Sequence, residues 1–166
     1  MKNMLIVLAM LLSGCVGKPE NITPVDKFET SRYLGKWYEI ARLDHSFERG
    51  LNQVSADYSL RDDGGLKVVN RGYKAATSEW KESVGKAYFV GQNDVGYLKV
   101  SFFGPFYGSY IVFDLDQDYQ HSMISGPDKS YLWILSRAPK MDDATKKRLV
   151  AKAQALGFDT AKLIYN

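Results

Sequence analysis

The sequence predicts an all-β fold, and three observations carry that prediction. Aromatic residues, which are enriched in strands, make up 13% of the 166 residues, and eleven of them are tyrosines. After residue 30 the chain contains β-rich runs separated by turn residues at short, regular intervals. Two of these runs, Gln53–Leu60 and Leu98–Phe102, alternate polar and apolar residues, which is typical of strands with one wet face and one buried face.

About eight strands are expected, and the turns between them favour antiparallel neighbours. The segment 61–65 carries an Asp-Gly hairpin signal, and 92–94 and 126–128 mark two further turns. Spacing typical of βαβ units is absent, so a parallel sheet is not expected. The expected strands are Trp37–Leu43, Gln53–Leu60, Leu66–Tyr73, Trp80–Val90, Gly96–Phe103, Tyr107–Leu115, Tyr119–Ser125 and Ser130–Arg137.

One helix is expected near the C-terminus, packed on the sheet. Asp142 is placed to act as its N-cap, Leu149 and Ala153 lie on one face at helical spacing, and Gly157 is placed to end it. A short final strand over 162–165 follows.

Composition excludes several classes of protein. The content of 45% hydrophobic and 25% charged residues is typical of a globular protein and argues against a disordered chain, a collagen-like repeat or a multi-span membrane protein. The length of 166 residues favours a single hydrophobic core. The formal charge of +3 is scattered, so no nucleic-acid partner is expected. Two histidines and no recognisable catalytic, phosphate-binding or metal-ligand motif indicate a protein that is not an enzyme, with no cofactor and no metal site.

The N-terminus resembles the leader of a bacterial lipoprotein. Lys2 precedes a short apolar stretch, Met4–Leu12, which is too short to span a bilayer. Leu-Ser-Gly-Cys at 12–15 resembles the lipobox, which implies cleavage before Cys15 and acylation of that residue. The alternative is a plain secretory leader with a chance cysteine.

The lipobox resemblance has consequences for location and domain organisation. Acyl chains on Cys15 would make the membrane a partner, and Val16 in place of an aspartate implies the outer membrane, with the protein on its periplasmic face. No second cysteine is available for a disulfide. We therefore divide the chain into a signal peptide (1–14), a lipid anchor and tether (15–30) and a folded domain (31–166).

Three motifs resemble those of the lipocalins. They are the G-x-W signature at Gly35 and Trp37, the D-x-x-Y turn at Asp116 and Tyr119, and Arg137 at the end of the eighth expected strand. Stretches such as 102–108 and 132–137 resemble the bacterial outer-membrane lipocalins in particular. The strand pattern alone leaves a sandwich or a barrel open. The resemblance implies an eight-stranded antiparallel up-and-down barrel with the C-terminal helix outside it.

The resemblance also implies structural roles for these motif residues. In lipocalins the G-x-W tryptophan closes one end of the barrel and the arginine lies across its indole, a contact of about 2 kcal/mol. Trp37 and Arg137 are therefore expected to be structural, with Gly35 beside them. Asp116 and Tyr119 are expected to organise a turn at the same end.

The resemblance places the functional site in the barrel interior, which in an eight-stranded barrel is wide enough for one small ligand. If Trp37 points inward, the alternation of strand residues also points Glu39 and Ala41 inward and Ile40 and Arg42 outward. A bulge of one residue would invert such a set. The expected cavity lining is Glu39, Ala41, Val54, Ala56, Tyr58, Ala87, Phe89, Leu98, Val100, Phe102, Tyr110 and Trp133, joined by Gly85, Val112 and Tyr131.

The lining is mostly apolar, which suits an acyl chain. The alternative is that these side chains fill a solid core. Glu39 is the exception and needs a hydrogen-bonding partner if it is buried. It either makes a structural bond or tunes the polarity of the cavity.

Two loops are expected to carry further contacts. The segment 43–52 is expected over the mouth, where Phe47 and Leu51 would contact ligand and Arg42, His45 and Arg49 would meet a phosphate or carboxylate. A purely solvated loop is the alternative. The aromatic turn 104–108 suits the mouth, a lipid surface or a dimer contact.

The resulting hypothesis is an outer-membrane-anchored lipocalin that binds a fatty acid or a lysophospholipid-like lipid for transport or storage. The alternative is a structural envelope lipoprotein with a packed barrel that docks another envelope component. A homodimer is left open.

Overall fold

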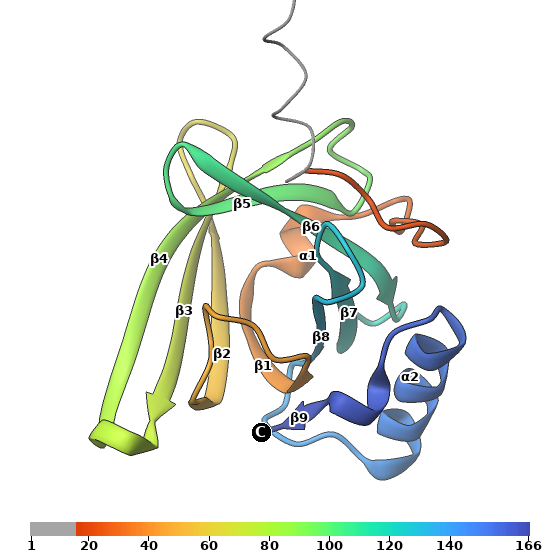
Figure 1. The fold of residues 1–166 in the computed structure, drawn as a ribbon. Coiled ribbons are helices and arrows are strands. Elements are labelled where there is room, and N and C mark those ends of the chain that lie inside the picture. The colour runs from red at the N-terminus through yellow and green to blue at the C-terminus, as the bar shows by residue number, and fades with distance from the viewer. Residues whose placement is uncertain (1–15) are drawn as a thin grey trace, which may run out of the picture.

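The computed structural model describes residues 16–166, so the expected signal peptide and the expected lipidation site, Cys15, lie outside the described residues. The strands form a closed antiparallel barrel in the order β2-β3-β4-β5-β6-β7-β8-β1, and β1 pairs with β2 to complete the ring (Figure 1). A short β9 pairs with β1 outside this ring. The elements are α1 (Thr30–Tyr33), β1 (Gly35–Arg42), β2 (Leu51–Leu60), β3 (Leu66–Lys74), η1 (Ala75–Thr77), β4 (Glu79–Phe89), β5 (Tyr97–Phe103), β6 (Phe106–Leu115), β7 (His121–Ser125), β8 (Leu132–Ser136), α2 (Asp143–Ala155), η2 (Thr160–Lys162) and β9 (Ile164–Tyr165).

The predicted barrel of eight strands with one C-terminal helix is confirmed. The ends of the eight barrel strands differ from the expected ones by at most two residues, and one of the two-residue differences lies at Tyr119, which belongs to a turn rather than to β7. Tyr119 has a φ of +55°, and Asp116 Oδ1 accepts hydrogen bonds from the backbone N–H groups of Gln120 and His121. The polar side chain of Asp116 thus takes the backbone bonds that a strand would otherwise make.

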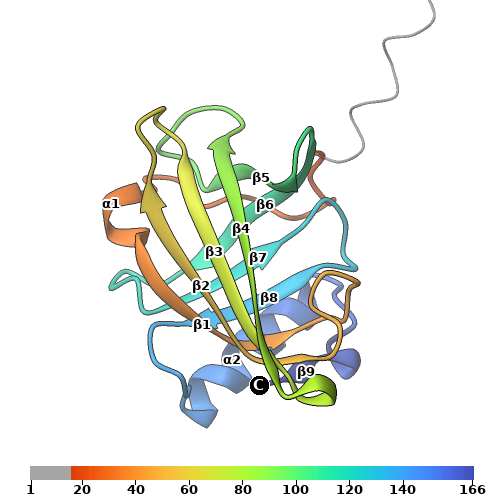
Figure 2. The ribbon, with the colours of Figure 1, turned by 90° about the vertical axis from the view of Figure 1, so that its left-hand side faces the viewer.

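The up-and-down topology gives the barrel two different ends. The turns 61–65, 90–96 and 116–120 lie at the closed end, together with α1. The loops 43–50, 75–78, 104–105 and 126–131 surround the other end, which we call the mouth. Figure 2 shows β2, β3 and β4 crossing in front of β5 to β8, with α2 behind and below them.

Helix α2 packs on the outside of the barrel. Asp142 caps it by accepting a hydrogen bond from the Thr145 backbone N–H at 2.8 Å. Its apolar face, with Leu149 and Ala153 fully buried, joins a core cluster with residues of β1, β6, β7 and β8. This cluster lies outside the barrel and leaves the interior to a second cluster.

The described part of the segment expected to be a tether is packed on the barrel. Ile22 is fully buried beside the helix cluster, and Phe28 is buried at the closed end. The backbone N–H of Val25 donates to the carbonyl of Val112, and the N–H of Gly96 donates to that of Val25. The apolar residues of this stretch bury themselves on the sheet, which the prolines around them did not indicate.

Strand β1 contains a bulge that changes which of its residues face inward. Its pairing with β8 runs Glu39 to Leu135 and then Ala41 to Ile134, so Ile40 is an extra residue. Ile40 and Ala41 both pack in the helix cluster outside the barrel. The inward expectation for Ala41 and the outward one for Arg42 are therefore wrong.

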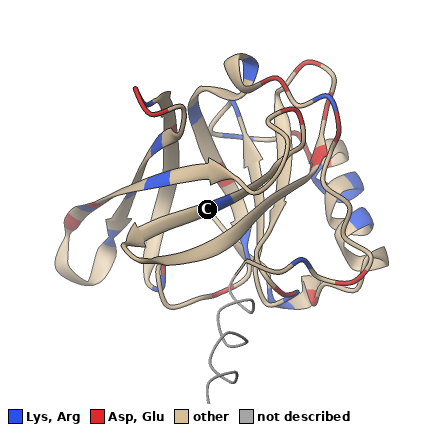
Figure 3. Ribbon diagram, turned by 90° about the horizontal axis from the view of Figure 1, so that it is seen from above, with Lys and Arg blue, Asp and Glu red and all other residues tan. Residues whose placement is uncertain are grey.

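Charged residues of both signs are interspersed around the barrel and along α2 (Figure 3). Among residues 16–166 there is no helix that combines the length and the apolar character needed to cross a membrane. The same residues contain no group of three or more His, Cys, Asp and Glu side chains that could hold a metal ion.

Candidate functional site

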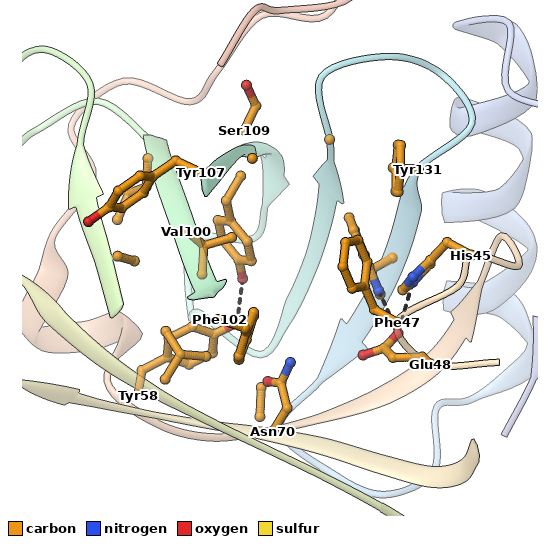
Figure 4. A pocket seen from close by; sticks show the side chains of 18 of the residues that line it. His45, Phe47, Glu48, Tyr58, Asn70, Val100, Phe102, Tyr107, Ser109 and Tyr131 are labelled. Atoms are coloured by element: carbon orange, nitrogen blue, oxygen red, sulfur yellow. Dashed lines mark hydrogen bonds and ion pairs between the residues drawn. The ribbon is translucent and has the colours of Figure 1, made fainter. Parts of the chain in front are cut away.

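The barrel is not packed shut. It encloses a cavity of about 510 Å³ that reaches the mouth, within the roughly 300–1,000 Å³ typical of small-molecule sites. Of the residues expected to line it, the structure places the following at the cavity: Glu39, Val54, Ala56, Tyr58, Ala87, Leu98, Val100, Phe102, Tyr110, Tyr131 and Trp133. Figure 4 shows several of them converging from opposite walls.

Four expected lining residues do not border the cavity. Two of them, Gly85 and Val112, are buried but are not among the residues that line it. Ala41 faces the helix cluster because of the bulge in β1. Phe89 belongs to the interior cluster but lies at its closed end, where its ring meets that of Phe28 with centroids 6.1 Å apart. Phe28 comes from the segment expected to be a tether, and it borders the cavity where Phe89 was expected.

Several lining residues were missed by the sequence reading. Leu66, Val68 and Asn70 line the cavity from β3, and their alternation with Lys67 in the sequence was a usable signal. Tyr33, from the short helix α1, had no comparable signal because no strand period applies to it.

Three tyrosine hydroxyls meet inside the cavity, toward the closed end. Tyr110 OH lies 2.8 Å from both Tyr33 OH and Tyr58 OH, so one hydroxyl joins the other two. Burial raises the pKa of Tyr33 to about 12 and raises those of Tyr58 and Tyr110 well above the ordinary value. This cluster is therefore an uncharged polar patch at the cavity floor.

A second polar group lies near the mouth, centred on Glu48. Oε2 of Glu48 accepts a hydrogen bond from Trp133 Nε1 at 3.0 Å and lies 3.0 Å from His45 Nε2 (Figure 4). Burial acts to raise the pKa of Glu48, but the contacts with His45 and Trp133 outweigh it and hold that pKa below its ordinary value. Glu48 is accordingly an ionised carboxylate in the cavity wall.

Glu39 lies next to this group and has a different protonation state. Its Oε1 accepts from Arg42 Nη1 at 2.7 Å and from Asn166 Nδ2 at 2.6 Å. Burial and the nearby charge of Glu48 raise the pKa of Glu39 to about 8, against the opposing effect of Arg42. At neutral pH the cavity wall thus holds one neutral and one ionised glutamate beside one arginine.

His45 presents an unused atom to this polar group. Its side chain is buried at the cavity, and Nδ1 has no hydrogen-bond partner within the part of the chain that the structure describes. An orphaned buried nitrogen of this kind is costly unless another group pairs with it. The polar group near the mouth therefore contains a nitrogen whose hydrogen bond no described residue of the protein supplies.

The two arginines beside the mouth are engaged by groups of the protein itself. Arg42 donates to the carbonyl groups of Glu48 and Leu51, so it holds the loop onto β1. Arg49 is exposed and pairs with Asp44 at 2.8 Å. The expected phosphate or carboxylate contacts of these two arginines are taken by the protein itself.

The lipocalin motif residues meet at the closed end. The Arg137 guanidinium lies 4.0 Å from the centroid of the Trp37 indole and donates to the carbonyl groups of Arg32, Lys36 and Tyr119. Gly35 has a φ of +88°, a left-handed conformation that favours glycine. This is the arrangement that the family resemblance implies for a barrel plug.

The loop tips around the mouth carry exposed phenylalanines. Phe47, Phe103 and Phe106 are 66%, 71% and 77% exposed, and all three border the cavity opening. We call these three residues the aromatic rim.

Comparison with known proteins agrees with this architecture. Residues 28–166 match the lipocalin-like domain family. The chain is 56% identical over 162 residues to the outer membrane lipoprotein Blc of Vibrio cholerae, covering 97% of this chain and 95% of that protein. It is 55% identical over 159 residues to the outer membrane lipoprotein Blc of Escherichia coli, covering 95% and 90%. Insecticyanin from the tobacco hornworm Manduca sexta shares the fold, with a TM-score of 0.71 at 21% identity over 90% of this chain and 86% of that one. The chain therefore belongs to the lipocalin-like family, in its subgroup of bacterial outer-membrane lipoproteins.

Proposed function

We propose that this protein binds a single-chain lipid, a fatty acid or a lysophospholipid-like molecule, in its barrel cavity for transport or storage in the cell envelope. The observation that carries the proposal is the cavity itself, which has an apolar middle and a polar group at the mouth. An acyl chain gains about 0.8 kcal/mol for each CH₂ group it buries, reduced by the entropy lost on entry. No catalytic step is part of the proposal.

The polarity of the two ends supports one orientation of the ligand. The group of Glu48, His45 and Arg42 lies near the mouth, and His45 Nδ1 has no hydrogen-bond partner among residues 16–166. The uncharged tyrosine patch lies deeper. We infer that the acyl chain enters first and that the head group stays at the mouth.

The location of the protein completes the proposal. We propose that acyl chains on Cys15 anchor the chain and that the barrel faces the periplasm. A carrier in this position would exchange lipid with the membrane that holds it.

Native mass spectrometry of residues 16–166, purified without detergent, tests the proposal. Stoichiometric lipid, either co-purified or taken up in titrations with fatty acids and lysophospholipids, is the expected result. A folded protein that stays empty under both conditions would overturn it and favour a docking role instead.

A further inference from the structure

The aromatic rim is the most exposed apolar feature of the barrel, and nothing in the ligand-binding proposal uses it. Phe103 and Phe106 face each other across the β5–β6 turn, and the two residues between them are also exposed. The third member, Phe47, stands on a different loop of the same mouth. Exposed apolar groups that cluster in this way mark a surface that binds another protein, a membrane or a ligand.

The neighbours of this turn have the character of residues at a lipid–water interface. Tyr107 follows Phe106, and the ammonium groups of Lys99 and Lys86 lie 5.0 Å and 6.0 Å from the centroid of its ring. Aromatic rings concentrate at the boundary of a bilayer, and lysines there are attracted to anionic head groups. The turn therefore combines apolar tips with flanking positive charge.

The described chain begins beside the same two strands. The Tyr97 hydroxyl, from β5, donates to the carbonyl of Val16, and Ser109 Oγ, from β6, donates to that of Gly17 at 2.5 Å. From Ser109 to Phe106 the strand runs about 10 Å. One residue, Val16, separates Gly17 from Cys15, so the chain between them spans at most about 7 Å. The anchor residue and the tip of the turn can thus reach the same membrane surface.

We propose that the aromatic rim, led by Phe103 and Phe106, docks on the bilayer that holds the acyl anchor, so that the mouth of the cavity opens onto lipid. The occupant of this surface is the membrane and not a second copy of the chain, because the anchor leaves the barrel beside the turn and because lysines flank it. This inference rests on the proposed function, since it describes how lipid would reach the cavity. It predicts that exchange proceeds at the membrane surface rather than through water.

The first test measures insertion of the turn. The full-length lipidated protein is placed in vesicles of phosphatidylethanolamine and phosphatidylglycerol, some of which contain phospholipid brominated along the acyl chain. The emission of the new tryptophan in a Phe106→Trp variant is obtained by subtracting the emission of the unsubstituted protein. The brominated lipid should quench this emission. Unquenched fluorescence would overturn the proposal, and cross-linking of Phe106→Cys to a second copy in the vesicles would identify a dimer contact instead.

The second test measures loading of the cavity. A photoactivatable lysophospholipid is supplied either within the same vesicles or from water, and labelled protein is counted by mass spectrometry. The measured quantity is the ratio of the loading rate from the bilayer to the loading rate from water. In a Phe103→Ser/Phe106→Ser variant this ratio should be about tenfold lower than in the unsubstituted protein. Leu60→Ser is the matched control, because Leu60 is 64% exposed but lies at the closed end.

The possible outcomes separate the two proposals. An unchanged ratio of the two loading rates in the Phe103→Ser/Phe106→Ser variant, or an equal change in Leu60→Ser, would contradict docking by the rim. Failure of the unsubstituted protein to load by either route would overturn the proposed function, and the quenching of Phe106→Trp would then still decide whether the rim enters the bilayer.

Discussion

Arg42 donates a hydrogen bond to Glu39 inside the barrel, with Arg42 Nη1 2.7 Å from Glu39 Oε1 and both side chains almost completely buried. The same guanidinium donates to the backbone carbonyl groups of Glu48 and Leu51. One buried cation thus ties the loop at the mouth to the strand that carries the motif at the closed end. The bulge in β1 makes this possible, because it turns Arg42 inward.

Substituting Arg42 with methionine should lower the free energy of unfolding by about 3 kcal/mol. The variant leaves Glu39 and two carbonyl groups without their donor in a buried place. Urea denaturation followed by tryptophan fluorescence measures the effect. The matched control is Arg49→Met, which removes an exposed ion pair with Asp44 and should cost less than about 1 kcal/mol. Equal losses in the two variants would contradict the role given to Arg42.

Glu39 should make the protein less stable as the pH rises through the neutral range. Its pKa in the folded protein is about 8 against an ordinary value of 4.5, so between these values the folded state holds a proton that the unfolded state has lost. The contribution is fully present below pH 4.5 and is lost by about pH 8. Glu39→Gln should therefore reduce the fall in stability over this window, by up to about 5 kcal/mol.

Denaturation curves collected at intervals across that pH window check this prediction. Glu82→Gln serves as the control, since Glu82 is an exposed carboxylate on β4 and should leave the pH dependence as it is. A Glu39→Gln variant whose stability still falls as steeply as that of the unsubstituted protein would show that another group titrates.

The sequence was sufficient to predict the barrel because its signals were regular. Alternation in the strands and the turn residues between them indicated antiparallel neighbours, and the motifs at Trp37 and Arg137 implied closure. Most of the cavity wall followed from alternation once the family resemblance had implied a barrel with Trp37 pointing inward. Leu66 and Val68 of β3 could have been found by the same rule.

The errors arose where a local deviation or a distant contact decides the outcome. The side chains of Ala41 and Arg42 exchanged faces because one extra residue at Ile40 shifts the register, and nothing in the neighbouring residue types marks such a bulge. Phe28 displaced Phe89 from the cavity because a segment before the first strand folds back onto the closed end. Contacts of this kind depend on the finished barrel and not on local pattern.

The plug at the closed end should stabilise the fold without affecting the ligand. Arg137→Ala removes a stack on a fully buried indole and three hydrogen bonds to carbonyl groups, and should cost about 2 to 3 kcal/mol of unfolding free energy. Arg71→Ala is the matched control, because Arg71 stacks on the exposed Trp80 at 4.7 Å and should cost less than about 1 kcal/mol. Lipid affinity, measured by titration, should stay the same in both variants. A selective loss of affinity in Arg137→Ala would place ligand at the plug.

Filling the cavity should weaken lipid binding while the barrel stays folded. Ala56 lines the cavity from β2, and an indole at this position occupies the volume that an acyl chain needs. Ala56→Trp should reduce lipid affinity about tenfold or more, the equivalent of losing two buried CH₂ groups. Lys67→Trp adds the same ring on the outer surface of β3 and should bind as before. Unchanged binding in a folded Ala56→Trp protein would mean that lipid binds elsewhere.

Tyr110→Phe separates the two orientations that a lipid can take in the cavity. The substitution removes the hydroxyl shared by Tyr33 and Tyr58, so Tyr58 loses its hydrogen bond and stability should fall by about 1 to 2 kcal/mol. If the acyl chain points to the floor, the floor becomes more apolar and fatty acid affinity should hold or rise. If the head group lies there, the lost hydroxyl should cost about tenfold in affinity. We expect the first result in isothermal titrations, because the tyrosine floor offers a carboxylate no positive charge, whereas His45 Nδ1, which has no partner among residues 16–166, lies near the mouth.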